Sequence, residues 1–129
     1  MPRSRHEEGM ETRRQVLGDA HVDRKEQGRN GFDGPFQDLI TEAAWGHVWS
    51  RPNWTKRERS MVTIALLAAL GHYDEMAMHI RATARTGASE DDVREALLHV
   101  AIYAGVPAAN QAIAVAKQAF AEMKAGTAE

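Results

Sequence analysis

The sequence contains no cysteine, and this absence removes several classes of chemistry at once. Without thiols the chain has no disulfide scaffold, no thiolate zinc site and no cysteine nucleophile. An excess of positive charge is missing too, because 16 lysines and arginines stand against 18 aspartates and glutamates among 129 residues. The resulting formal net charge of −2 argues against a protein that holds nucleic acid through phosphate contacts.

Long hydrophobic runs are also missing. The longest largely aliphatic run, residues 61–70, is about half the length that spans a bilayer. The first eight residues contain no apolar segment of the kind found in a secretory signal. We therefore expect a soluble cytoplasmic protein without a membrane or nucleic-acid partner, and its length suits one domain of ordinary size.

The composition changes near residue 34. Residues 1–34 carry seven basic and seven acidic residues but few large apolar ones, so this stretch buries too little surface to fold alone. Helical spacing predicts a short helix over residues 5–17, and the glycine-rich residues 28–35 predict a loop. We therefore divide the chain into a polar N-terminal arm, 1–34, and an all-α domain, 35–129. The arm is either a solvated tail or a segment that orders against a neighbouring subunit.

From Pro35 onward the pattern is helical throughout. Two capping-box patterns, residues 55–58 and 89–92, mark helix starts, and glycine or proline marks the ends. No segment shows sustained alternation with a period of two, so we expect an all-α fold without strands. The predicted helices cover roughly residues 35–49, 55–70, 72–85, 89–103 and 107–125.

The predicted helix through residues 61–70 is apolar on nearly all of its faces. Such a helix has to be covered all round. The few other helices of this short chain can hardly do so within one subunit. We therefore expect a homo-oligomer.

The helix that begins near His72 carries candidate functional residues beside its packing face. His72, Glu75 and His79 lie at i, i+3 and i+7, next to the core stripe, where partial desolvation adjusts the proton affinity of a histidine. The alternatives are a boundary histidine satisfied by a carbonyl or water, and a metal site, for which two histidines and one glutamate are a weak signal. The expected apolar stripe consists of Tyr73, Met76, Ala77, Ile80 and Ala84.

Glu58 stands at the head of the apolar helix. It is either the capping residue of the first turn or a carboxylate aimed into a subunit cleft. The cations around it, which either attract an anionic substrate or form a solvated charged turn, are Arg51, Lys56, Arg57 and Arg59. Three nearby tryptophans, at 45, 49 and 54, suit either a pocket lining or the core. From the residues alone, the sequence indicates an all-α oligomer with a His/Glu/Arg pocket.

Several blocks of the sequence resemble the carboxymuconolactone decarboxylase family. The N-terminal blocks, which are typical of the decarboxylases themselves, are RQVLGDAHVDR (14–24), FQDLIT (36–41) and WGHVWSRP (45–52). The C-terminal blocks, shared with the wider superfamily that includes the alkylhydroperoxidase AhpD, are RERSMVTIAL (57–66), ALGH (69–72), His79 with Gly87, and AIYAGVPAAN (101–110). The similarity extends from about residue 8 to the final helix.

This resemblance implies an AhpD-like helical bundle that assembles as a homo-oligomer, expected to be a hexamer. It implies decarboxylation of 4-carboxymuconolactone, a lactone dicarboxylate, to 3-oxoadipate enol-lactone and CO2, without cofactor or metal, in the protocatechuate branch of the β-ketoadipate pathway. The AhpD-type relatives use a Cys-x-x-Cys pair on the helix that carries the histidine. His72 and Glu75 occupy those places here, so peroxidase chemistry is excluded.

On this resemblance, we expect His79 and Glu58 to be catalytic. Loss of CO2 leaves a delocalised furanolate, which needs a proton donor for carbon and positive groups near the lactone oxygen. We assign the protonation of carbon to His79. We expect Glu58 to orient the His79 side chain or to set its charge. The residues expected to bind substrate are Arg51, Arg59, Arg81, His72, Glu75 and Tyr103. Two alternatives stay open: a decarboxylase or isomerase of a related lactone, and a non-catalytic helical oligomer with a His/Glu metal or structural site.

Overall fold

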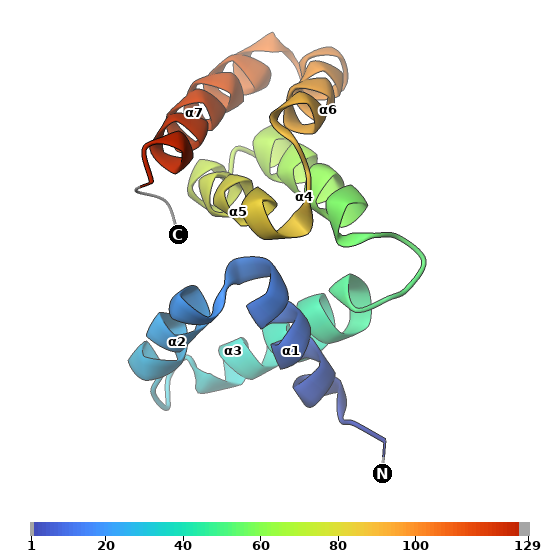
Figure 1. The fold of residues 1–129 in the computed structure, drawn as a ribbon, viewed down its shortest axis with the longest axis vertical. Helices are drawn as coiled ribbons and strands as arrows, with labels where there is room; N and C mark the ends of the chain where they lie inside the picture. The colour runs from blue at the N-terminus through green and yellow to red at the C-terminus, as the bar shows by residue number, and fades with distance from the viewer. Residues whose placement is uncertain (1, 127–129) are drawn as a thin grey trace. The chain divides into compact units, whose positions relative to one another are not determined.

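A computed structural model describes residues 2–126, which fold into helices joined by short turns and contain no strand (Figure 1). The all-α class predicted from the sequence is confirmed. No helix of the described chain is both long and apolar enough to cross a membrane. In chain order the helices are α1 (Arg5–Leu17), α2 (Asp19–Gly28), α3 (Gly34–Ile40), the π-helix η1 (Thr41–Trp49), α4 (Lys56–Leu70), α5 (Tyr73–Thr86), α6 (Glu90–Tyr103) and α7 (Val106–Lys124).

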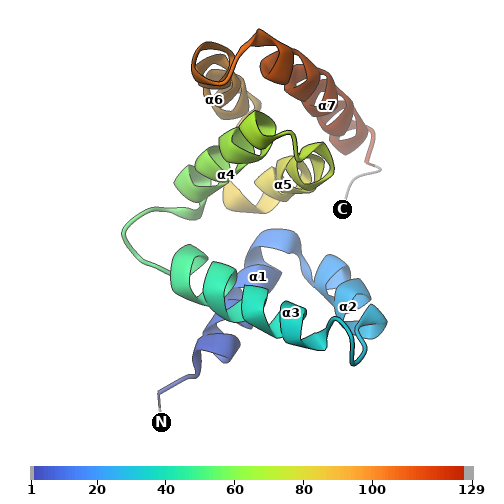
Figure 2. The same cartoon turned by 180° about the vertical axis from the view of Figure 1, so that it is seen from behind.

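The chain forms two compact units, of which the first ends at Thr55 and the second begins at Lys56. Figures 1 and 2 show the helices of each unit from opposite sides. This division comes later in the chain than the change of composition at residue 34, because α1 packs against η1 within the first unit. The separation of residues 1–34 as an arm therefore stays a prediction.

In the first unit, α1 and η1 approach closely because glycines face each other at the crossing. A Cβ atom on Gly9 would collide with the carbonyl oxygen of Thr41, and one on Gly46 would lie 2.7 Å from the carbonyl oxygen of Arg5. Backbones come this near only where no side chain separates them. The polar N-terminal segment is thus held by close backbone packing rather than by a large apolar face.

The N-terminal segment contains more helix than the sequence pattern predicts. The helix over 5–17 is confirmed as α1, which begins with a capping box between Ser4 and Glu7. The following helix, α2, was not predicted, since Val22 is its only buried residue. Arg14 stabilises its first turns through ion pairs with Asp19 at 3.1 Å and Asp23 at 2.9 Å.

Arg13 is a charged residue inside the first unit, with only 3% of its surface exposed. Its Nη2 donates to Oε1 of Gln37 at 3.3 Å. Burial lowers the pKa of this guanidinium, and the charge of Glu26 works in the opposite direction. The N-terminal segment thus contributes a buried cation as well as a helix.

The single helix predicted over residues 35–49 is an α-helix followed by a π-helix. Trp45 and Trp49, four residues apart in the π-helix, lie about one turn from each other. Their rings pack in a tilted arrangement with centroids 5.1 Å apart, and both are buried. Hydrophobic periodicity does not distinguish the two kinds of helix.

In the second unit, α4 to α7 share one hydrophobic core, and their boundaries match the predicted ones. Gly87 ends α5 in the left-handed conformation, and a capping box between Ser89 and Asp92 begins α6. The helices pack closely because α7 presents alanines toward the core. The core side chains include Ile64, Met76, Ile80, Val93, Leu97, Val100, Ala109, Ala112, Ala116 and Ala119.

One face of α4 is left uncovered by the rest of the second unit. Ser60, Ile64 and Ala68 are buried, whereas three large residues on the opposite side are 41%, 57% and 67% exposed. These residues, Val62, Leu66 and Leu70, form the α4 outer stripe. The rest of the second unit therefore does not cover this helix all round, and the homo-oligomer stays a prediction.

Candidate active site

The buried polar side chains described in the second unit lie on two helices, α4 and α5. They are Ser60 on α4 together with His79, Thr83 and Thr86 on α5. The three α5 residues lie at i, i+4 and i+7, so they form a single stripe, which we call the polar seam. His79, 6% exposed, is its one titratable member.

The threonines of the polar seam are satisfied locally, which lets them be buried. The Thr83 hydroxyl donates to the carbonyl oxygen of Ile80 at 2.6 Å, and the Thr86 hydroxyl accepts from the amide of Ala88 at 3.5 Å. The buried side of α5 is therefore shifted from the predicted apolar stripe. Ala84, assigned to that stripe from the sequence, is exposed, because its methyl group gains little from burial.

Glu58 lies in the first turn of α4, and an ion pair holds this turn in place. The neighbouring Arg57 donates from Nε and Nη2 to the two carboxylate oxygens of Asp92, both at 2.7 Å. Asp92 also accepts from the amide of Ser89 at 2.9 Å. This clamp joins the start of α4 to the start of α6, which follows α5 after Gly87. Glu58 itself is exposed, in the first turn of α4.

The clamp also sets the charges at this end of the unit. The hydrogen bond from Arg57 holds the pKa of the Asp92 carboxyl far below its usual value, and Asp92 in turn raises the pKa of Arg57. The positive charge of Arg57 is thus largely neutralised by the carboxylate of Asp92. Lys56 and Arg59, both partly buried, lie in the same turn. Cations here add to the positive end of the helix dipole, and the sum favours an anionic group.

The remaining arginines predicted to bind substrate lie elsewhere. Arg51 is exposed and belongs to the first unit. Arg81 is partly buried, two residues after His79, and lines a hollow of about 380 Å³ between α5 and α7. Side chains two apart on a helix point in nearly opposite directions, so Arg81 does not share the face of the polar seam.

His72, Glu75 and Tyr103 are all on the surface. His72 precedes α5 and Glu75 lies in its first turn, both exposed. Tyr103 is 86% exposed at the C-terminal end of α6, with its ring stacked over His99. At 1.5 Å per residue it is roughly 16 Å along the axis from Asp92 and the start of α4. In this subunit these three residues are not gathered with Glu58.

The histidine and glutamate stripe does not assemble a metal site. Across residues 2–126 there is no group of three or more histidine, aspartate or glutamate side chains that could hold a metal ion. The stripe is divided instead, with His79 buried and the other two members exposed. The geometry therefore singles out His79 and the turn that carries Glu58 as the candidate active site.

Reasoning from the sequence missed three residues near this site. Thr83 and Thr86 carry a recognisable signal, because they continue the helical spacing of His79. Ser60 lies directly before the apolar run 61–70 and has no partner residue at helical spacing that would single it out. The sequence pattern indicated Arg57 only as one of several cations that attract an anion. Its ion pair could not be predicted, because its partner Asp92 lies 35 residues away.

Comparison with known proteins identifies the family. The model of the carboxymuconolactone decarboxylase family matches residues 34–118. A 4-carboxymuconolactone decarboxylase from Acinetobacter baylyi is 44% identical over 119 residues, which cover 92% of this chain and 89% of the relative. A second relative of that name, from Pseudomonas putida, is 52% identical over 44 residues, 34% of this chain and 92% of the relative. Nitrosuccinic acid decarboxylase from Metarhizium robertsii is 36% identical over 91% of this chain and 82% of its own length.

These matches extend across both compact units and include the blocks around Glu58 and His79. The resemblance seen in the sequence is thereby confirmed. The chain belongs to the carboxymuconolactone decarboxylase family.

Proposed function

We propose that this chain decarboxylates 4-carboxymuconolactone to 3-oxoadipate enol-lactone and CO2, as an enzyme of the β-ketoadipate pathway. The observation that carries this proposal is the 44% identity, over 92% of the chain, to a 4-carboxymuconolactone decarboxylase. The polar seam supports it, because it puts one titratable side chain in the buried part of the second unit. We place the enzyme in the cytoplasm, with the other steps of such a pathway.

In the proposed reaction the bond between the ring carbon and the departing carboxylate breaks. Its electron pair is delocalised toward the lactone carbonyl, which leaves a furanolate and CO2. The imidazolium of His79 then gives its proton to carbon and regains one from solvent, so charge and atoms balance. A partly buried donor suits this step, because exclusion of water strengthens its interaction with the developing anion.

Glu58 and Arg59 have supporting roles in this proposal. The Glu58 carboxylate orients His79 or favours its charged form. Arg59, in the same turn, anchors the carboxylate that is not lost. Arg51, Arg81, His72, Glu75 and Tyr103 stay candidates for substrate binding, and surface residues such as Tyr103 can serve the site of a neighbouring subunit.

Substitution of His79 tests the mechanism. Turnover of 4-carboxymuconolactone by His79→Ala should fall on the order of 10²- to 10³-fold, because the proton donor is removed. His99→Gln is the matched control, since it removes an exposed histidine of the same unit and should leave turnover unchanged. A folded His79→Ala protein with wild-type turnover would remove His79 from the mechanism.

We also propose that the reaction needs neither metal nor organic cofactor. The furanolate is stabilised by its own conjugation, so cationic side chains suffice to support it. Protein that has been treated with a chelator and dialysed should keep its full rate. A rate that disappears with the chelator and returns with one added metal would contradict this.

A second candidate is the decarboxylation of a related dicarboxylate, favoured by the 36% identity to nitrosuccinic acid decarboxylase. Nitrosuccinate also loses CO2 from a carbon next to an electron sink, where a nitronate forms in place of the furanolate. Assay of both compounds with the same enzyme preparation distinguishes the two functions. Faster turnover of nitrosuccinate than of the lactone would favour the second candidate.

We further propose that the chain assembles as a homo-oligomer, specifically a hexamer. The support is the α4 outer stripe, which leaves Val62, Leu66 and Leu70 substantially exposed on the helix whose residues 61–70 are almost all apolar. Isolated exposed leucines are common, but a row of three at helical spacing is typical of an interface. A second copy of the chain is the occupant that the family resemblance favours.

A further inference from the structure

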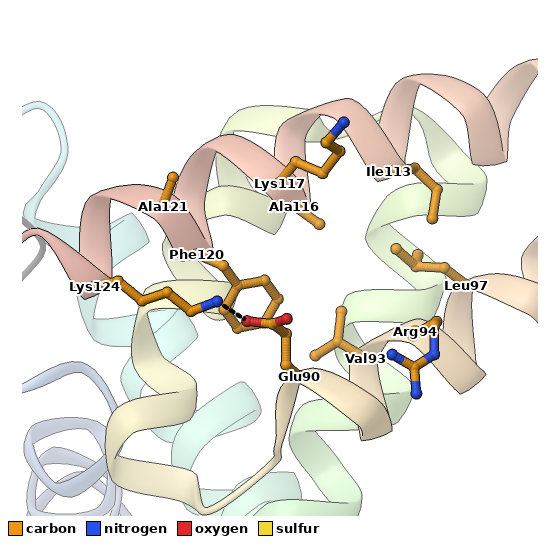
Figure 3. Close-up of a pocket in the computed structure, with 10 residues that line it drawn as sticks. All are labelled: Glu90, Val93, Arg94, Leu97, Ile113, Ala116, Lys117, Phe120, Ala121 and Lys124. Atoms are coloured by element: carbon orange, nitrogen blue, oxygen red, sulfur yellow. Dashed lines mark ion pairs between the residues drawn. The ribbon is translucent and has the colours of Figure 1, made fainter.

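Helices α6 and α7 enclose a groove of about 380 Å³ that shares no residue with the polar seam (Figure 3). Its walls are apolar, with Val93 and Leu97 from α6 facing Phe120 from α7. Ala116 and Ala121 keep the α7 side open, because neither fills the space between the helices. A volume of this order accommodates a small molecule with a single ring.

An ion pair crosses the groove near one end, where a second hollow continues past the same residues toward Thr83 and Met123. Nζ of Lys124 on α7 lies 2.9 Å from Oε1 of Glu90 on α6, and the dashed line in Figure 3 crosses in front of the Phe120 ring. A helix or strand laid along the groove would have to break this pair. The pair therefore favours a short ligand over a segment of another chain.

Among the charged residues that line the groove, one cation has no ion-pair partner in the described chain. Arg94 pairs with Asp91 on its own helix, with Nη2 2.6 Å from Oδ1. Lys117 lines the groove and forms no ion pair or hydrogen bond with any residue of the described chain. The groove therefore combines an apolar body with one unneutralised ammonium group on its α7 side. In Figure 3 this group points away from Val93 and Leu97, and rotation of the flexible lysine side chain brings it to the groove.

We propose that this groove is a binding site for a small organic monocarboxylate with a planar apolar body, such as an aromatic acid. The ring packs against Phe120 and the Val93–Leu97 wall, and the carboxylate accepts a charge-assisted hydrogen bond from Lys117. A phosphate-bearing ligand fits less well, because most of the lining is apolar and Lys124 is already paired. None of the residues that line the groove is a proposed catalytic residue.

Benzoate is the probe that tests this proposal on the full-length protein. Saturation-transfer difference NMR should detect its binding, and equilibrium dialysis should give its Kd. Lys117→Gln should weaken benzoate binding about 5-fold or more, through loss of the charged hydrogen bond. Benzyl alcohol, which keeps the ring without the charge, should bind the wild type more weakly by a similar factor. Ala121→Leu, which fills the groove from its exposed side, should abolish benzoate binding.

Two controls separate this site from others. Lys25→Gln removes an exposed lysine of the first unit and should leave the Kd of benzoate unchanged. Turnover of 4-carboxymuconolactone should be the same in Lys117→Gln as in the wild type, because Lys117 has no part in the proposed reaction. The binding result does not depend on that turnover, so a failure of the proposed function does not affect it.

Several outcomes would overturn the proposal. Equal benzoate affinity in wild type, Lys117→Gln and Ala121→Leu would place the binding elsewhere. Equal affinity for benzoate and benzyl alcohol would mean that the groove does not recognise the anion. No benzoate binding to the wild type would also overturn it, and a lower sedimentation mass of Ala121→Leu would then identify a second copy of the chain as the occupant. If Ala121→Leu fails to fold, Lys117→Gln and the comparison with benzyl alcohol still decide whether the groove binds the carboxylate.

Discussion

Single residues in the second unit illustrate how burial distinguishes functional from structural side chains. The sequence assigns His79 and His72 to one helical stripe, yet His79 is 6% exposed and His72 lies on the surface just before α5. Exclusion of water strengthens the interaction of a buried donor with a developing anion. The proton donor of the proposed reaction is therefore assigned to the buried residue.

Ser60 offers a test at the scale of one hydroxyl group. Its Oγ is buried and has no hydrogen-bond partner within the described chain. Ser60→Ala removes this unsatisfied group, so the free energy of unfolding should stay level or rise by about 1 kcal/mol. Urea denaturation of the full chain measures the change.

Ser50 is the matched control for this substitution. Its hydroxyl donates to the carbonyl oxygen of Trp45 at 2.7 Å and lies 2.8 Å from Oγ1 of Thr12. Ser50→Ala should therefore lower the free energy of unfolding by about 1 kcal/mol. Equal losses from both substitutions would contradict the difference between the two sites.

At the scale of helices, the clamp between Arg57 and Asp92 holds the turn that carries Glu58. Asp92→Asn breaks the two-bond ion pair and weakens the cap of α6. The variant should melt at a lower temperature than the wild type at pH 7, and turnover should fall through misplacement of Glu58. Arg94→Gln breaks only an exposed pair within α6 and should change neither property.

The clamp also predicts a dependence on pH. Because the pKa of Asp92 is lower in the folded chain than its usual value of 3.8, its contribution is fully present above that value. The contribution is lost as the pH falls through the lower, folded pKa. The difference in melting temperature between wild type and Asp92→Asn should thus persist from pH 7 to pH 5 and shrink in stronger acid. A difference that grows below pH 4 would contradict this assignment.

Local signals predicted most of the helices, because caps and glycines are encoded within a few residues. Ser89 with Asp92 began α6, and Gly87 ended α5, as the sequence indicated. The helix α2 and the π-helix η1 could not be found in this way. The first buries only Val22, and the second differs from an α-helix in hydrogen bonding rather than in pattern.

The candidate site was predictable only in part. His79 and Glu58 follow from spacing and family resemblance, and Thr83 and Thr86 could have been added from the same helical spacing. The pairing of Arg57 with Asp92 depends on the packing of α4 against α6, which no local pattern contains. The placement of Arg81 and Tyr103 also required the fold.

At the scale of the whole molecule, the α4 outer stripe is an apolar surface that the rest of the second unit leaves uncovered. Leu66→Glu puts a charge at the middle of this stripe, where Leu66 is 57% exposed. If a second copy covers the stripe, sedimentation should show a smaller species than the wild type. Gln118→Glu introduces the same charge at an exposed position of α7, and the sedimentation mass should then stay that of the wild type. An unchanged mass for Leu66→Glu would rule out the stripe as the interface.

The N-terminal segment makes a second prediction at this scale. Since α1 packs against η1 through Gly9 and Gly46, removal of residues 1–34 uncovers that crossing. The truncated protein should melt at a lower temperature. If the segment also orders against a neighbouring subunit, the truncated protein should form a smaller oligomer. A truncated protein with the mass and melting temperature of the full chain would leave residues 1–34 a solvated tail.

The central claim is that this chain decarboxylates 4-carboxymuconolactone with His79 as the proton donor and without a metal. The most direct measurement follows the ultraviolet absorbance of the lactone, formed in place from 3-carboxymuconate by its cycloisomerase, in the presence of chelator. Our account predicts rapid conversion to the enol-lactone by the wild type and by His99→Gln, and a rate on the order of 10²- to 10³-fold lower for His79→Ala. Folded, oligomeric wild-type protein that gives no rate above the spontaneous background would contradict it.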